Sequence, residues 1–218
     1  MQAQTAYDML ERSGLMVGMR GKFTPDVALA TAEIMMNTRI NVFEMTTNSV
    51  QAFEAMKAVK REYGDEAVVG MGTVLNADLA RRAIDEGADF VVAPSFDPLM
   101  IEAAQAAGVL AIPGVMTPTE IVNAWVTGVK IVKIFPIGAL GVDYFRNVRG
   151  PLDQVKFCCN GGMSDQNVGE FIKAGATACG MANWLTGDGT MPADTMAHRA
   201  KVLRDIVDRT RANLPVIV

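Results

Sequence analysis

One lysine within an apolar run has a setting suited to covalent chemistry. The segment Val129–Pro136 is apolar and β-branched apart from Lys130 and Lys133, a pattern that predicts a buried strand. Desolvation favours the neutral form of an amine, and a neutral lysine can attack a carbonyl carbon to form a Schiff base. Because side chains alternate along a strand, Lys133 shares a face with Ile131 and Phe135, whereas Lys130 lies at the start of the run. Lys133 is therefore a candidate nucleophile, and the alternative for both lysines is a strand-end position that reaches water.

A carboxylate interrupts a second apolar run in the same way. Glu44 lies between Phe43 and Met45 within the expected strand Asn41–Thr46. Burying a carboxylate is costly unless it is paired. Glu44 could pair with Lys133, or it could transfer protons during a reaction. A purely structural ion pair is the alternative.

Small and polar residues follow other expected strands, where the active end of a parallel barrel would lie. Thr73 comes directly after Gly72, and its hydroxyl is suited to hold a carboxylate, although Thr73 or Asn76 could instead cap the next helix. Arg20 follows the first expected strand and could bind an anionic substrate at the barrel mouth, or it could simply be solvated.

Glycine-rich turns follow the last two expected strands. One contains Asn160-Gly161-Gly162, and the other runs from Gly180 through Met181 to Asn183. Exposed backbone N–H groups near a helix start favour an anion such as phosphate, so these turns predict a phosphate cradle. Tight-turn geometry without ligand binding is the alternative.

A repeated unit along the chain must position these residues. It consists of an amphipathic helix, a glycine and a short apolar strand, as around Gly87, Gly108, Gly128 and Gly175. Helices that alternate with strands predict βα units and a parallel sheet. We expect eight strands, near Leu15–Met19, Asn41–Thr46, Ala67–Met71, Asp89–Ala93, Val109–Ile112, Lys130–Phe135, Val155–Cys159 and Thr177–Met181.

Eight βα units predict an α/β fold, a (β/α)8 TIM barrel with an N-terminal helix over Ala3–Arg12 and a final helix over Pro192–Arg211. We expect residues 1–218 to form a single domain. An open doubly wound sheet is the alternative, and the lack of a glycine-rich dinucleotide motif after the first strand disfavours it.

Composition excludes several functional classes. The 20 Lys and Arg residues against 24 Asp and Glu give no sign of nucleic-acid binding, and no apolar run reaches the ~20 residues of a membrane span. The N-terminus is polar, unlike a signal peptide, and the three cysteines lie in apolar runs, as expected of free thiols in a cytoplasmic protein. The single histidine, His198, lies in a polar helical segment, where we expect a surface residue. A histidine triad or histidine-rich metal site is therefore disfavoured.

Taken together, these motifs resemble a known family. From about Leu15 to Leu185 the chain is similar to bacterial 2-keto-3-deoxy-6-phosphogluconate (KDPG) and 4-hydroxy-2-oxoglutarate (KHG) aldolases. The Gly-Thr-Val-Leu and Lys-hydrophobic-Phe-Pro signatures together are specific to it. The matching segments are Phe43-Glu44 with Thr46, Gly72–Asn76, Ala93-Pro94, Ile112–Gly114, Lys133–Pro136 and Asn160–Gly162.

The resemblance implies a class I aldolase without metal or cofactor. Such an enzyme would cleave a 2-keto-3-deoxy sugar acid to pyruvate and an aldehyde such as glyceraldehyde 3-phosphate. KDPG is the substrate that we expect most. Lys133 would form the Schiff base and Glu44 would carry protons. It also implies a homotrimer. The implied substrate-binding residues are Thr73 for the pyruvate carboxylate, Pro94 and Phe135 for the pocket walls, and Arg20, Asn160, Gly161, Gly162, Met181 and Asn183 toward the distal phosphate or carboxylate.

The chain departs from the family pattern around the catalytic pair. Asn48 stands where KDPG-type members carry arginine, as in the phosphogalactonate-type relatives, and Asn160 replaces the usual threonine before Gly-Gly. Asn183 replaces a serine, and Ile137–Leu140 lacks an acidic residue that some members have. The aldehyde and the configuration at C4 therefore stay open, with 2-keto-3-deoxy-6-phosphogalactonate (KDPGal) and KHG as alternative substrates.

Two readings from other functional classes also stay open. A phosphosugar isomerase could use the same barrel and phosphate cradle, but it would have no use for Lys133 and Glu44 at adjoining interior positions. A non-catalytic anion-binding barrel is the other reading. It is disfavoured because buried ion pairs kept only for structure are often replaceable by apolar residues.

Overall fold

A single parallel sheet closes into a barrel, which confirms the predicted fold class. The computed structural model describes residues 1–214. The sheet order is β5-β4-β3-β2-β1-β9-β8-β7-β6, with all of these neighbours parallel. The strands are β1 (Leu15–Met19), β2 (Val42–Thr46), β3 (Val68–Gly72), β4 (Phe90–Val92), β5 (Leu110–Ile112), β6 (Gly114–Val115), β7 (Val132–Ile134), β8 (Phe157–Asn160) and β9 (Ala178–Met181).

The fifth predicted strand is divided in two, and this division closes the barrel. β5 pairs with β4, whereas β6 pairs with β7, and Pro113 lies between them. Proline has no backbone N–H, so it interrupts the ladder but can still accept a hydrogen bond. The Pro113 carbonyl accepts from the Lys133 backbone N–H at 2.8 Å. The nine strands of the described chain therefore occupy the eight strand positions predicted from the sequence.

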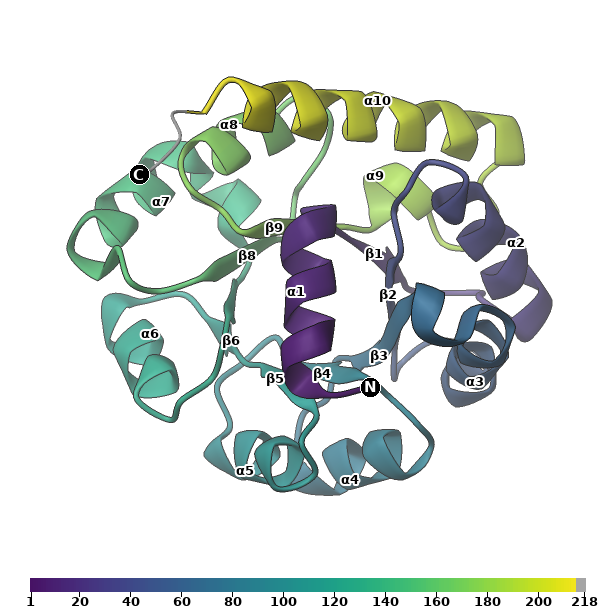
Figure 1. Cartoon of the computed structure of the whole chain (residues 1–218), viewed down its shortest axis with the longest axis horizontal. Helices are drawn as coiled ribbons and strands as arrows, with labels where there is room; N and C mark the ends of the chain where they lie inside the picture. The colour runs from purple at the N-terminus through teal and green to yellow at the C-terminus, as the bar shows by residue number, and fades with distance from the viewer. Residues whose placement is uncertain (215–218) are drawn as a thin grey trace.

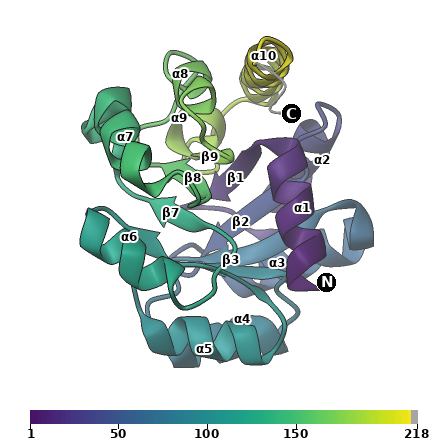
Figure 2. The same ribbon diagram turned by 60° about the vertical axis from the view of Figure 1, so that its left-hand side comes forward.

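Helices surround the barrel, and one helix covers its end. Figure 1 shows α1 lying across the middle of a ring of helices, and Figure 2 shows it beside the strands. The helices are α1 (Ala3–Ser13), α2 (Pro25–Met36), α3 (Ala52–Tyr63), α4 (Ala77–Asp85), α5 (Pro98–Ala106), α6 (Pro118–Trp125), α7 (Gly141–Arg149), α8 (Val168–Lys173), α9 (Asn183–Thr186) and α10 (Ala193–Ala212).

Local sequence signals account for several helix boundaries. Thr117 and Glu120 form a capping box at the start of α6, with Pro118 in the first turn. Asn76 caps α4, because its side chain accepts the Leu79 N–H at 2.9 Å. Asn76 rather than Thr73 is thus the cap, which resolves one alternative left open by the sequence.

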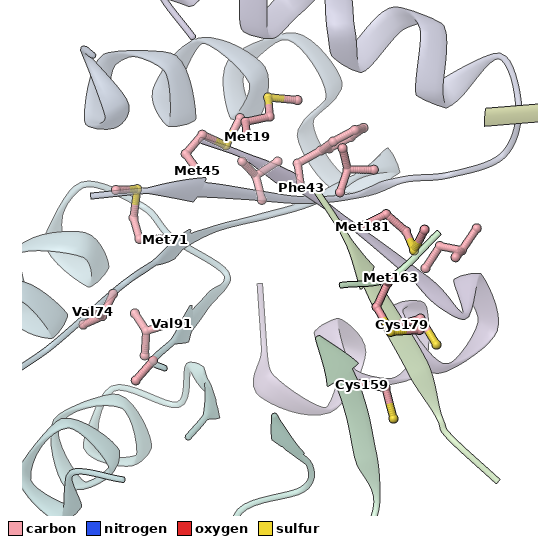
Figure 3. Close-up of a cluster of buried hydrophobic side chains, with 14 of the residues drawn as sticks. Met19, Phe43, Met45, Met71, Val74, Val91, Cys159, Met163, Cys179 and Met181 are labelled. Atoms are coloured by element: carbon pink, nitrogen blue, oxygen red, sulfur yellow. The ribbon is translucent and has the colours of Figure 1, made fainter. Parts of the chain in front are cut away.

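The strands separate two apolar layers, because alternate side chains face opposite sides of the barrel wall. The outer layer packs between strands and helices, and Figure 3 shows part of it, including Phe43, Met71, Cys159 and Cys179. The inner layer fills one end of the barrel and packs against α1. It includes Met16, Val42, Val68, Phe90, Leu110, Cys158 and Ala178 from the strands, Ile131 directly before β7, and Ala6, Tyr7, Met9 and Leu10 from α1.

Several smaller expectations can be compared with the structure. Cys158, Cys159 and Cys179 are buried free thiols, and His198 is exposed, as predicted. Lys130 lies before β7, and its Nζ donates to Gln4 Oε1 of α1 at 2.6 Å, at the covered end of the barrel. Among residues 1–214, no helix combines the length and apolar character that a membrane span requires.

Candidate active site

A cavity of about 720 Å³ opens at the carboxyl ends of the strands. Active sites of parallel barrels form at this end because the βα loops meet there. Its lining combines two buried ionisable groups with many small residues. The lining residues are Gly18, Arg20, Glu44, Thr46, Lys133, Phe135, Pro136, Gly138, Ala139, Asn160, Gly161, Gly162, Met163, Ser164, Gly180, Met181, Ala182, Asn183 and Trp184.

The two ionisable residues singled out in the sequence meet inside this cavity. Lys133 on β7 and Glu44 on β2 are each 4% exposed, and Lys133 Nζ lies 3.8 Å from Glu44 Oε1. The ammonium also lies 5.1 Å from the centroid of the Phe135 ring. A separation of 3.8 Å is within ion-pair range but beyond a direct hydrogen bond. The pair can therefore compensate its charges while the amine remains available to a ligand.

A glycine on the neighbouring strand provides the space for the carboxylate. Gly72 on β3 pairs in register with Thr46 on β2, two residues beyond Glu44. A Cβ atom at Gly72 would lie only 1.9 Å from Glu44 Oε1. The glycine before Thr73 therefore lets the Glu44 side chain lie against the β3 backbone.

Asn160 has a similar arrangement with another glycine. Its side chain is 6% exposed, and a Cβ atom at Gly180 on β9 would lie 1.9 Å from Asn160 Nδ2. The Cys158 thiol donates to Asn160 Oδ1 at 3.1 Å. Burial raises the pKa of the Cys158 thiol to about 12, the nearby Lys133 charge lowers it and Glu44 raises it. Cys158 is therefore a neutral donor at physiological pH.

The mouth of the cavity carries more exposed polar groups. Arg20, Gly162 and Asn183 are exposed, and all three belong to the cavity lining. Backbone contacts fix the loop that carries Arg20, because Lys22 N–H donates to the Asp188 carbonyl at 2.7 Å.

The two predicted glycine-rich turns both line the cavity. Gly161 and Gly162 have φ values of 88° and 74°, which favour glycine. Helix α8 starts only at Val168, whereas α9 starts at Asn183 itself. The backbone of these turns, more than a long helix, shapes the mouth.

Two of the predicted site residues do not line the cavity, and a third is buried in the outer apolar layer. Thr73 and Pro94 follow β3 and β4 at the same end of the barrel, but they are not among the residues that line the cavity. The Thr73 carbonyl accepts from Thr47 Oγ1 at 2.8 Å. Met181 lines the cavity, yet it is fully buried and belongs to the outer apolar layer shown in Figure 3. A specific substrate contact of its side chain is therefore not favoured.

The cavity also includes polar or aromatic residues that the sequence analysis did not select. Thr46 shares the inner face of β2 with Glu44, and strand alternation already placed them together. Ser164 and Trp184 follow the two glycine-rich turns. In the sequence, only their positions next to those turns indicated that they could belong to the site. Whether such residues face the cavity depends on the conformation of the loop.

Comparisons with known proteins identify the family of the chain. A family model described as "KDPG and KHG aldolase" matches residues 14–202. The KHG/KDPG aldolase of Escherichia coli K12 is 30% identical over 182 residues, covering 83% of this chain and 85% of that protein. The 2-dehydro-3-deoxy-6-phosphogalactonate aldolase of the same strain is 31% identical over 183 residues, covering 83% and 89%.

A solved structure has a similar fold over most of its length. The structure described as "Native KDPGal structure" has a TM-score of 0.86 at 27% identity, and the match covers 91% of this chain and 96% of that chain. The family match extends over nearly all of the barrel, from the first strand to the middle of α10. The chain therefore belongs to the KDPG and KHG aldolase family, whose members are carbon–carbon lyases.

Proposed function

We propose that this protein is a class I aldolase that cleaves KDPG to pyruvate and glyceraldehyde 3-phosphate. One observation carries the proposal: a buried lysine amine, Lys133 Nζ, lies 3.8 Å from the Glu44 carboxylate within a cavity at the active end of the barrel. This combination supplies a nucleophile and a proton carrier, which are the two groups that Schiff-base cleavage requires.

The reaction begins when the Lys133 ammonium passes a proton to Glu44, and the neutral amine then attacks the C2 keto carbon of the substrate. The resulting carbinolamine must lose its hydroxyl as water, which requires a proton. Glu44 is the carboxyl group nearest to Lys133 Nζ in the cavity lining, so it is the proposed donor. Loss of water leaves an iminium ion joining Lys133 to C2.

Cleavage follows because the iminium accepts electrons better than a ketone does. The C4 hydroxyl loses its proton to Glu44, the C3–C4 bond breaks, and its electron pair forms an enamine with C3 and C2. The aldehyde leaves with C4. Protonation of C3 and hydrolysis of the iminium then release pyruvate and restore Lys133.

Binding of the two substrate ends follows the shape of the cavity. Arg20 is the cationic side chain of the lining other than Lys133, so it is the proposed partner of the distal phosphate. The Gly161 and Gly162 backbone and Asn183 complete this end, and Phe135 packs beside the reacting carbon. Asn160 donates to the middle of the substrate. Thr73 and Pro94 lie outside the described cavity lining, and their proposed place at the pyruvate end rests on the family resemblance.

The exposed Arg20 and the two glycine-rich turns at the mouth suit a distal phosphate, so they favour KDPG and KDPGal over KHG. The choice of KDPG over KDPGal rests on the family resemblance alone. The test is the rate of pyruvate release from KDPG, KDPGal and KHG under the same conditions. The proposal predicts the highest kcat/KM for KDPG. A higher value for KDPGal or KHG would reassign the substrate, and no pyruvate from any of the three would favour an isomerase or a binding protein.

A homotrimer remains a prediction from the family resemblance. We expect the trimer interface to bury some of the exposed apolar side chains, which include Leu75, Leu99, Val122 and Val126. Light scattering of the purified protein tests it, and a monomer at micromolar concentration would contradict it.

A further inference from the structure

We propose that Cys158 is a positioning residue, whose thiol orients the Asn160 side chain so that its amide NH2 donates into the cavity. The inference rests on the proposed aldolase function, because the oriented donor acts on the substrate bound at Lys133. Cys158 itself does not touch the substrate in this account.

The thiol and the amide are joined by a direct contact. Cys158 and Asn160 are two residues apart on β8, so both face the barrel interior. Cys158 Sγ donates to Asn160 Oδ1 at 3.1 Å, and the thiol is fully buried. With Oδ1 held by this donor, the amide nitrogen must face away from the thiol.

Burial keeps the thiol in the form that can donate. The raised pKa of Cys158, about 12, means that the thiol is protonated at neutral pH. A thiolate at this position would instead accept from Nδ2 and turn the amide around. The protonated thiol thus selects one of the two amide orientations.

The opposite side of the amide is fixed by the missing side chain at Gly180. A Cβ atom there would lie 1.9 Å from Asn160 Nδ2, so only glycine leaves room for the amide. Within the described part of the chain, no acceptor is hydrogen-bonded to Nδ2. Asn160 and Gly180 both line the cavity, which places this free donor where a ligand can reach it.

The strand register places the donor relative to Lys133. Cys158 pairs with Lys133 in the parallel ladder, and Asn160 lies one side-chain step further toward the cavity mouth. A substrate attached to Lys133 through C2, with its distal anion at Arg20, must pass Asn160 with its middle carbons. The amide NH2 therefore meets an oxygen of these carbons, close to the bond that breaks.

Cys159 provides a matched control for the deletion of a buried thiol. It is the next residue on β8, it is also fully buried, and it faces the outer apolar layer instead of the cavity (Figure 3). Cys158→Ala and Cys159→Ala remove the same atom from opposite faces of one strand. A purely packing role of Cys158 would give similar consequences for both variants.

The test is a double-mutant cycle on kcat/KM for pyruvate release, together with thermal unfolding of each variant. We expect Cys158→Ala to lower kcat/KM by roughly threefold to tenfold, the value of one hydrogen bond. Cys158→Ser should restore kcat/KM to within about twofold because a hydroxyl can donate to Oδ1. Cys159→Ala should lower the unfolding temperature and leave kcat/KM unchanged.

The decisive comparison uses Asn160→Ala. If Cys158 acts through Asn160, then Cys158→Ala has no further effect on kcat/KM in the Asn160→Ala background. Additive effects, or an equal loss of kcat/KM in Cys159→Ala, would overturn the inference while the wild-type activity stands. A wild-type protein that neither releases pyruvate nor forms a pyruvate adduct would overturn the proposed function, and this inference with it.

Discussion

The two ends of the barrel interior are built from the same strands and differ in almost every physical respect. At the end covered by α1, inward side chains such as Met16 and Val42 are fully or almost fully buried in an apolar layer. Two residues further along the same strands, Gly18 and Glu44 line an open cavity. One step of strand alternation therefore separates the part of the interior that stabilises the barrel from the part that can carry out chemistry.

Glycines account for much of this difference. At the covered end, side chains fill the barrel and pack against α1 residues such as Leu10. At the open end, Gly72 and Gly180 leave room for the Glu44 and Asn160 side chains, which would otherwise collide with a Cβ atom. Substitutions at the two ends should therefore separate activity from stability.

The largest effect on activity is expected at the nucleophile. Lys133→Ala should reduce pyruvate release from KDPG by roughly 10³-fold or more, because no other lysine lines the cavity in the described part of the chain. Circular dichroism should show a folded protein. Activity within tenfold of the wild type would show that the reaction does not require the Lys133 amine.

Glu44→Gln should have the next largest effect. The amide preserves the shape of the side chain but cannot carry the proton, so kcat should fall by about 10²–10⁴-fold. Stopped assays with borohydride should still detect some pyruvate adduct, formed more slowly. An unchanged kcat would assign proton transfer to another group.

Gly72→Ala tests the space that the open end requires. The added methyl group must displace the Glu44 carboxylate, and we expect kcat/KM to fall by about tenfold to 100-fold, in line with the sensitivity of catalysis to small displacements. Gly150→Ala is the matched control, because a Cβ atom at Gly150 meets nothing within 4 Å. Equal kinetic effects of the two substitutions would contradict this reason for a glycine at position 72.

The smallest effect on turnover is expected at the covered end. Leu10 is 1% exposed, and Leu10→Ala should lower the free energy of unfolding by about 2–5 kcal/mol. Because the proposed catalytic residues Lys133 and Glu44 lie at the opposite end, kcat should stay within about twofold at temperatures where the protein is folded. Denaturant titration and steady-state kinetics measure both quantities. A large loss of kcat without a loss of stability would contradict the claim that the covered end stabilises the barrel and the open end carries the activity.

The sequence predicted the barrel, and it selected Lys133 and Glu44 as charged residues within buried strands, because both inferences follow from local patterns. The repeated helix–glycine–strand unit predicts parallel strands, and alternation tells which residues share a face with Lys133 and with Glu44. The structure shows that both of these faces point into the barrel. The division of the fifth strand at Pro113 depends on its partners on both sides, which no local pattern specifies.

Other features depended on side-chain directions that only the fold determines. Thr73 has the same strand-end signal as Arg20, yet only Arg20 lines the cavity. The bond between Cys158 and Asn160 requires a particular orientation of the amide, and the sequence pattern indicated no more than a buried thiol. Distances across the barrel and amide orientation are therefore the information that the sequence lacks.

Covalent capture of pyruvate tests the central claim most directly. The protein is incubated with pyruvate and sodium borohydride, weighed by mass spectrometry, and digested to locate the modification. Lys133→Ala is the test variant, and Lys130→Ala, from the same segment but at the covered end, is the matched control. We predict one reduced pyruvate adduct on Lys133 in the wild type and in Lys130→Ala, and none in Lys133→Ala. No adduct in folded wild-type protein, or an adduct that persists in Lys133→Ala, would contradict the assignment of Lys133 as the Schiff-base residue.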